Sequence, residues 1–180
     1  MHLLQHEDIN LQGLIGIFFY PIIYSLIKSW DIFNKPLYLY EIFNTWRIFV
    51  NSCFTSGNQN LFGSNDPDEI FDRILIDLLI PRFSECLLTC DIREYGPILN
   101  FLNEWKPLFS EKTWTYVQKA LLNSLLDYFE DWDPTSDVIP VHVWILCYYD
   151  IFGREFEIVY KSILRKMMHF LRNWHPSDPF

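Results

Sequence analysis

The chain has 180 residues, of which 50% are hydrophobic and 18% aromatic, so it is long enough to bury one sizeable core. Its 14 Lys and Arg residues are outnumbered by 23 Asp and Glu residues, and the net charge is −9. A charge of this sign repels phosphate backbones and argues against direct nucleic-acid binding.

A repeated pattern of about 42 residues organises the chain. An apolar helical segment ends in an aromatic or thiol residue followed by a polar one, at Cys90-Asp91, Trp132-Asp133 and Trp174-His175. Trp30-Asp31 has the same pattern, at a spacing lengthened by an insertion of about 18 residues. Repeats of this length are typical of helical pairs in an α-solenoid, so we predict an all-α fold of stacked helical hairpins.

The first unit is expected over residues 11–50, with a turn at 34–36 between its two helices. Its apolar run, 14–26, is shorter than the ~20 residues of a membrane span and follows no positively charged segment, so it reads as a buried helix. Residues 51–68 are rich in turn formers and are predicted to be a surface insertion loop.

The second unit is expected over 70–109, with Asp66 or Asp68 capping its first helix. Pro81 should bend that helix, as Pro21 should bend the preceding one, because proline removes a backbone donor. Ser110 is expected to cap the third unit, 114–152, whose return helix ends at Gly153.

The fourth unit, 156–178, has an ascending helix over 156–173 and no second arm. We therefore expect one helical-repeat domain over 1–180 that is a segment of a longer repeat protein.

Two related motifs stand one unit apart. Residues 132–137 read Trp-Asp-Pro-Thr-Ser-Asp and residues 174–178 read Trp-His-Pro-Ser-Asp. With this spacing, the sequence resembles the GC-rich-factor-like helical domain of the tuftelin-interacting protein family, which includes a yeast spliceosome-disassembly G-patch factor. The motif residues are Trp132, Asp133, Pro134, Pro140, His142, Trp144, Trp174, His175, Pro176, Ser177 and Asp178.

The resemblance implies a nuclear pre-mRNA splicing factor that takes part in late spliceosome and intron-lariat disassembly. In that family a glycine-rich G-patch stimulates a DEAH-box RNA helicase, and the helical domain docks on spliceosomal proteins. The six glycines here are scattered and form no G-patch, so the helicase would be contacted by a part that this sequence lacks. The alternative is a DNA-associated transcription factor, which the family's name suggests and the charge opposes.

No group of residues indicates catalysis, a cofactor or a metal, and we expect a protein that is not an enzyme. His2 and His6 have helical spacing but lack the glutamate of a zincin motif. His142 is interpreted as a hydrogen-bonding residue at a helix end. The cysteines at 53, 86, 90 and 147 form no CxxC pair and are predicted to be buried and reduced.

The acidic residues near the third repeat corner suggest an acidic ridge that could meet a basic protein surface. They are Asp127, Glu130, Asp131, Asp133 and Asp137. Trp132 and Trp174 are predicted to fill the gaps between units, with each indole N–H reaching a loop carbonyl. Trp46, Trp105 and Trp144 are expected in the core.

Overall fold

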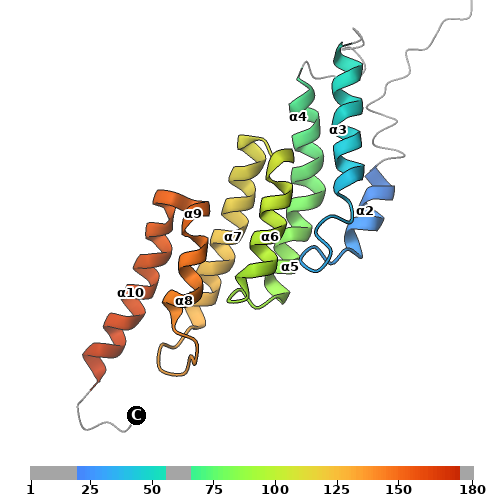
Figure 1. The fold of residues 1–180 in the computed structure, drawn as a ribbon. Helices are drawn as coiled ribbons and strands as arrows, with labels where there is room; N and C mark the ends of the chain where they lie inside the picture. The colour runs from blue at the N-terminus through green and yellow to red at the C-terminus, as the bar shows by residue number, and fades with distance from the viewer. Residues whose placement is uncertain (1–19, 56–65, 175–180) are drawn as a thin grey trace, which may run out of the picture.

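The computed structural model describes residues 20–55 and 66–174, and within these ranges it is helical and contains no strand. The all-α prediction is therefore confirmed. Antiparallel helices lie side by side in an elongated row, with α2 and α3 at one end and α10 at the other (Figure 1). The helices that run toward the lower edge in this view are α2 (Tyr20–Lys28), α4 and α5 (Pro67–Ile74 and Ile80–Thr89), α7 (Glu111–Asp131) and α10 (Phe156–Asn173).

The helices that return from this edge are α3 (Tyr40–Thr55), α6 (Tyr95–Trp105), and a third one built from α8 (Val141–Ile145) and α9 (Tyr149–Phe152). This third helix is irregular, because a 3-10 turn over Leu146–Tyr148 separates α8 from α9. The turn after α9 contains Gly153, whose φ of 53° is a conformation that glycine adopts readily. The predicted break at Gly153 is confirmed.

Most helix ends lie where local chemistry predicts them. Ser110 caps α7, where its hydroxyl oxygen accepts a hydrogen bond from the Thr113 backbone N–H at 3.1 Å. Asp66, rather than Asp68, caps α4 in the same way. The insertion loop was predicted over residues 51–68, but α3 continues to Thr55 and α4 begins at Pro67, so both ends of this stretch are helical. Residues 56–65 lie outside the described residues.

Pro81 is accommodated by a change of helical winding. The helix from Pro67 to Thr89 is continuous, but Leu75–Leu79 form a π-helical turn in which the Ile80 N–H bonds the Leu75 carbonyl. A π turn replaces the regular i→i−4 ladder at the point where proline has no N–H to donate. A bend was predicted at Pro81, and the structure has a wider π-helical turn just before it. The residues before Pro21 lie largely outside the described part of the chain.

The core is rich in aromatic rings that join neighbouring hairpins. Trp105 of α6 is fully buried against Trp30, Phe43 and Phe101, with ring centroids 5.4–5.6 Å apart. One hairpin further, Phe129 of α7 stacks on Trp144 at 5.6 Å with the two planes 7° apart. Trp105 and Trp144 are core residues as predicted, whereas Trp46 is only half-buried.

Replacing Phe129 with alanine is expected to lower the free energy of unfolding by about 3–5 kcal/mol. The ring is fully buried, and its loss leaves a cavity between α7 and α8. Urea denaturation followed by circular dichroism measures the change. Phe170→Ala, on the exposed side of α10, is the matched control and should cost less than about 1 kcal/mol. Equal losses in the two variants would contradict the assignment of Phe129 to the core.

Candidate interaction edge

Three loops follow α2, α5 and α7 and lie along the same edge of the helical row (Figure 1). We call this the loop edge and define it as residues 29–39, 90–94 and 132–140. Each of α5, α7 and α10 ends in the same way: Cys90, Trp132 and Trp174 are C-caps with extended backbones, at φ −91° to −65° and ψ 128° to 156°. These residues stand 42 positions apart, so the sequence pattern coincides with the helix ends.

Two of the corner tryptophans bind their own loops five residues ahead. The Trp30 indole donates to the Lys35 carbonyl at 2.7 Å, and the Trp132 indole donates to the Asp137 carboxylate at 2.9 Å. Both side chains are buried. A bond to a loop carbonyl was predicted for Trp132, which uses the Asp137 carboxylate instead, whereas Trp30, for which no such bond was predicted, makes one. In each case a loop is fixed to the helix that precedes it.

Asp137 is the centre of a hydrogen-bond network that joins two loops. Its side chain is 7% exposed, and it accepts hydrogen bonds from Trp132, from the Tyr128 hydroxyl at 3.3 Å and from the Ile139 backbone N–H at 3.1 Å. Arg93, from the loop after α5, completes the set with an ion pair at 3.2 Å. The two loops are therefore held together across 44 residues of sequence.

The electrostatics of Asp137 follow from these contacts. Burial would raise the pKa of its carboxyl group, but hydrogen bonds from Trp132 and Ile139 and the positive charge of Arg93 outweigh burial and hold the pKa below its usual value. The carboxylate is thus charged at neutral pH. Arg93 is held in turn by Asp91, with Nη2 to Oδ2 at 2.7 Å.

The loop after α2 is held by groups from the second hairpin. The Nε and Nη2 atoms of Arg82 both donate to the Trp30 carbonyl, at 3.1 and 2.9 Å, and its Nη1 atom pairs with Glu85. The Trp105 indole donates to the Pro36 carbonyl at 2.7 Å. The loop edge is therefore cross-linked between hairpins by side chains that bind backbone carbonyls.

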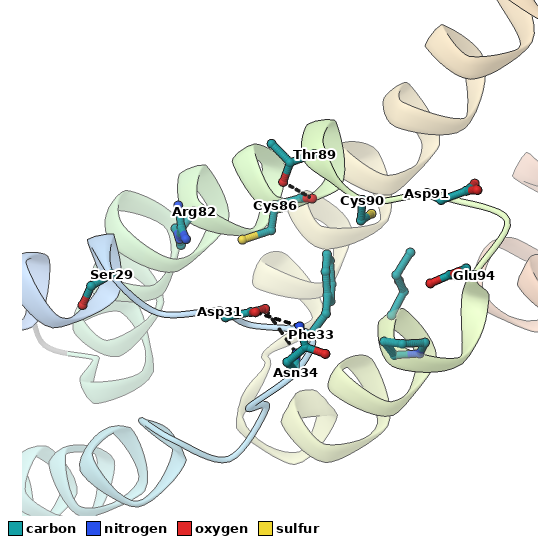
Figure 2. Close-up of a pocket in the computed structure, with 12 residues that line it drawn as sticks. Ser29, Asp31, Phe33, Asn34, Arg82, Cys86, Thr89, Cys90, Asp91 and Glu94 are labelled. Carbon is teal, nitrogen blue, oxygen red and sulfur yellow. Dashed lines mark hydrogen bonds between the residues drawn. The ribbon is translucent and has the colours of Figure 1, made fainter.

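A polar cavity of about 420 Å³ opens between the loop after α2, the end of α5 and the start of α6. Figure 2 shows Asp31, Asn34, Cys86, Cys90 and Glu94 around it. Asp31 accepts two hydrogen bonds from Asn34, which lower the pKa of its carboxyl group. Asp31, Asp91, Glu94 and Arg82 are the charged residues of its lining, so negative groups predominate there.

The two thiols of this cavity are protonated at neutral pH. Burial raises the pKa of Cys86, and it raises the pKa of Cys90 to about 11. A protonated thiol is a poor nucleophile and a poor metal ligand. All four cysteines are free, as predicted, but only Cys86 is fully buried and the other three are half-buried. Among residues 20–55 and 66–174, no three His, Cys, Asp or Glu side chains form a group that could hold a metal ion.

The motif residues of the third corner differ in burial and in their contacts. Trp132 and Trp144 are buried, Pro140 is the N-cap of α8, and Asp133 is exposed with its carboxylate bound to Thr135. Pro134 is half-buried in the same loop. His142 is exposed on α8, and within the described structure its ring makes none of the expected hydrogen bonds. The predicted hydrogen bond from His142 to a helix end is therefore not found among the described residues, and the side chain is exposed to solvent.

The motif of the fourth corner is only partly described. Trp174 is 39% exposed, so the buried position predicted for it is not found. The residues that would complete its corner, His175, Pro176, Ser177 and Asp178, lie outside the described residues, as do His2 and His6.

The predicted acidic ridge is present in four of its five members. Asp127, Glu130, Asp131 and Asp133 are exposed at the end of α7 and in the loop that follows. Asp137 belongs instead to the buried network. The sequence did not predict Arg93 and Tyr128 as partners of Asp137, because Arg93 comes from another hairpin and Tyr128 lies in α7 outside the motif.

A family model for GC-rich sequence DNA-binding factor-like proteins matches residues 2–180. The chain belongs to this family. Its relatives include tuftelin-interacting protein 11 of Bos taurus and of Gallus gallus, each 24% identical over 164 residues, and that of Danio rerio, 23% identical over 175 residues. The alignments cover 88%, 88% and 97% of this chain.

The chain spans about a fifth of the length of these relatives, with 19%, 19% and 21% of them covered. The resemblance drawn from the tryptophan motifs is confirmed by both comparisons. None of the helices in the described part of this family member is long and apolar enough to cross a membrane.

Replacing Asp137 with asparagine is expected to lower the free energy of unfolding by about 2 kcal/mol at neutral pH, because Arg93 keeps only Asp91 as an ionic partner and one buried acceptor of the network becomes a donor. The pKa of Asp137 is lowered in the folded state, so its contribution is complete above the unfolded pKa of about 4 and disappears as the pH falls through the folded value. The difference between wild type and variant should therefore shrink as the pH falls below about 4.

Urea denaturation across this pH range measures both effects. Asp131→Asn is the matched control, since Asp131 is an exposed carboxylate at the end of α7, and it should change stability by less than about 0.5 kcal/mol. A pH-independent difference for Asp137→Asn would rule out the charged network.

Proposed function

We propose that this chain is a non-catalytic protein-interaction module of a nuclear pre-mRNA splicing factor. The observation that carries the proposal is the family match over residues 2–180, together with similarity to tuftelin-interacting protein 11 over most of the chain. The splicing factor would act in late spliceosome and intron-lariat disassembly. Its DEAH-box helicase partner would be bound by a G-patch outside this sequence.

The module is built, in this proposal, as an α-solenoid of hairpins with a 42-residue repeat. Three C-caps in the same extended conformation, 42 residues apart, support this reading. The units are 11–50, 70–109, 114–152 and 156–178. Extended stacks of hairpins offer long surfaces and are commonly used to bind other proteins.

The loop edge is the part of the module that we assign to partner binding. Its loops are tied to one another by Arg93, Arg82 and Trp105, so the surface is organised before a partner arrives. Acidic groups are exposed along it at Asp31 and at the ridge that ends α7. These charges would steer a basic protein surface toward the edge.

A catalytic role finds little support in the polar cavity. Its thiols are protonated and its carboxylate Asp31 is bound by Asn34. Arg82 directs its donors to Trp30 and Glu85. General acid–base chemistry requires groups with contrasting proton affinities aimed at a substrate. The groups of this cavity instead bind nearby residues of the same chain.

Charge reversal on the ridge is expected to separate partner binding from folding. In nuclear extract, cross-linking and mass spectrometry of the tagged full-length protein should recover late spliceosome components. The double variant Asp127→Lys, Asp131→Lys should reduce that recovery about tenfold, because the ridge then repels a basic partner.

The matched control is Glu104→Lys, Glu155→Lys, which introduces the same charge change at exposed positions near the opposite edge. Recovery should be unchanged in this control. Failure of the wild-type protein to enrich spliceosome components would refute the splicing proposal, and equal loss in both variants would refute the assignment of the ridge.

The second candidate function is DNA binding, which the description of the matching family suggests. The net charge of −9 and the exposed carboxylates of the loop edge weigh against it. In a gel-shift titration at low salt, salt-sensitive binding would favour this candidate over the interaction module.

A further inference from the structure

Helix α10 has one face that no described element covers. Phe156, Val159 and Ile163 are buried on the side that packs against α7. Beside this buried face, Tyr160, Leu164 and Leu171 are 53%, 41% and 61% exposed. They are spaced at i, i+4 and i+11, so they form one stripe along the helix.

The residues equivalent to Leu171 in the two preceding helices are buried, whereas those equivalent to Leu164, which are Ile80 and Leu122, are half-buried. Leu87 and Phe129 stand 84 and 42 positions before Leu171 and are 3% and 0% exposed. Phe129 is covered by a ring of the next helix, because it stacks on Trp144 of α8. At the C-terminal end of the stripe, Leu171 thus occupies a position that a following helix covers in the preceding unit.

A basic row runs next to the stripe. Lys161, Arg165 and Arg172 repeat the i, i+4, i+11 spacing one residue later, so they flank the apolar side chains. Lys161 pairs with Glu157 at 2.8 Å, while no ion pair involves Arg165 or Arg172 in the part of the chain that the structure describes. Helix α10 has four basic residues and one acidic residue, in a chain whose net charge is −9.

We propose that this face of α10 binds an amphipathic helix of a separate partner protein, with an apolar stripe flanked by Asp or Glu residues. The apolar side chains of the partner would cover Tyr160, Leu164 and Leu171, as α8 covers Phe129. Its carboxylates would pair with Arg165 and Arg172, whose guanidinium groups can bind carboxylates through two parallel hydrogen bonds. This inference rests on the proposed interaction function, and its surface adjoins the acidic ridge, since Glu130 and Arg165 line one shallow pocket.

Charge complementarity selects this occupant. When a helix binds in a groove, apolar side chains at helical spacing make the main contacts, and the charges beside them determine which partners bind. A partner with basic flanks would meet repulsion from Arg165 and Arg172. An acidic one would gain ion pairs that are partly shielded from water by the apolar contact.

The test uses the 180-residue chain and a fluorescein-labelled, 18-residue helical peptide with Leu at i, i+4, i+7 and i+11 and Glu at the flanking positions. Fluorescence anisotropy should report saturable binding. Arg165→Glu, Arg172→Glu should weaken it about tenfold or more, and the same peptide with Lys in place of Glu should bind this variant better than the wild type. This exchange of preference is a readout that damage to the fold would not produce.

Two matched variants test the location. Leu171→Gln removes an exposed apolar side chain and should weaken binding, whereas Lys28→Glu, Arg73→Glu changes the same charge at exposed positions of α2 and α4 and should leave it unchanged. Unchanged thermal melting confirms that each variant is folded. Absence of binding, or equal binding of the Glu and Lys peptides, would overturn the proposal.

Three further outcomes would also overturn it. Concentration-dependent association that Leu171→Gln abolishes would assign the face to a second copy of the chain. Binding of a single-stranded RNA oligonucleotide in place of the peptide, lost in Arg165→Glu, Arg172→Glu, would assign it to nucleic acid. Peptide binding to residues 1–180 but not to the longest form of the protein would assign it to an internal contact. Spliceosome recovery in nuclear extract tests the interaction function separately, so the two can fail independently.

Discussion

A buried indole needs a hydrogen-bond acceptor for its N–H group, and this requirement organises the loop edge. Trp30 and Trp132 close helices and use acceptors in their own loops, while Trp105 uses a carbonyl of a neighbouring loop. Each bond fixes the path of a loop relative to a helix. Trp144 is different: its buried N–H has no hydrogen-bond partner within the described structure, and the ring is held by stacking on Phe129.

The second organising element is the carboxylate of Asp137. It accepts from Trp132 and Tyr128 within its own hairpin and from Arg93 in the preceding one. A buried charge is tolerated when it is paired and its lone pairs are used, and both conditions hold here. The network therefore converts two separate loops into a single surface, while the remaining carboxylates of the ridge stay in solvent and free to meet a partner.

The elements that depend on local signals could be predicted from sequence. The ends of α5, α7 and α10, the Ser110 cap and the break at Gly153 follow from apolar spacing, capping chemistry and backbone preference. The pairing of Arg93 with Asp137 could not be predicted, since it joins positions 44 residues apart and depends on how adjacent hairpins stack. For the same reason Asp137 was assigned to the solvent-exposed ridge, although its neighbours there were placed correctly.

The π turn before Pro81 bears on how this domain tolerates changes of length. A turn of this kind contains one residue more than regular winding needs, so the two parts of the helix, Pro67–Ile74 and Ile80–Thr89, are rotated by about 100° relative to an uninterrupted α-helix. In the first part Asp72 accepts hydrogen bonds from Ser110 and Thr113, and in the second Phe83 stacks on Phe101. The extra residue lets both contacts face inward at once. An insertion or deletion of one residue in a helix normally rotates every later side chain away from its neighbours. Here the π turn accommodates one extra residue without this loss of contacts.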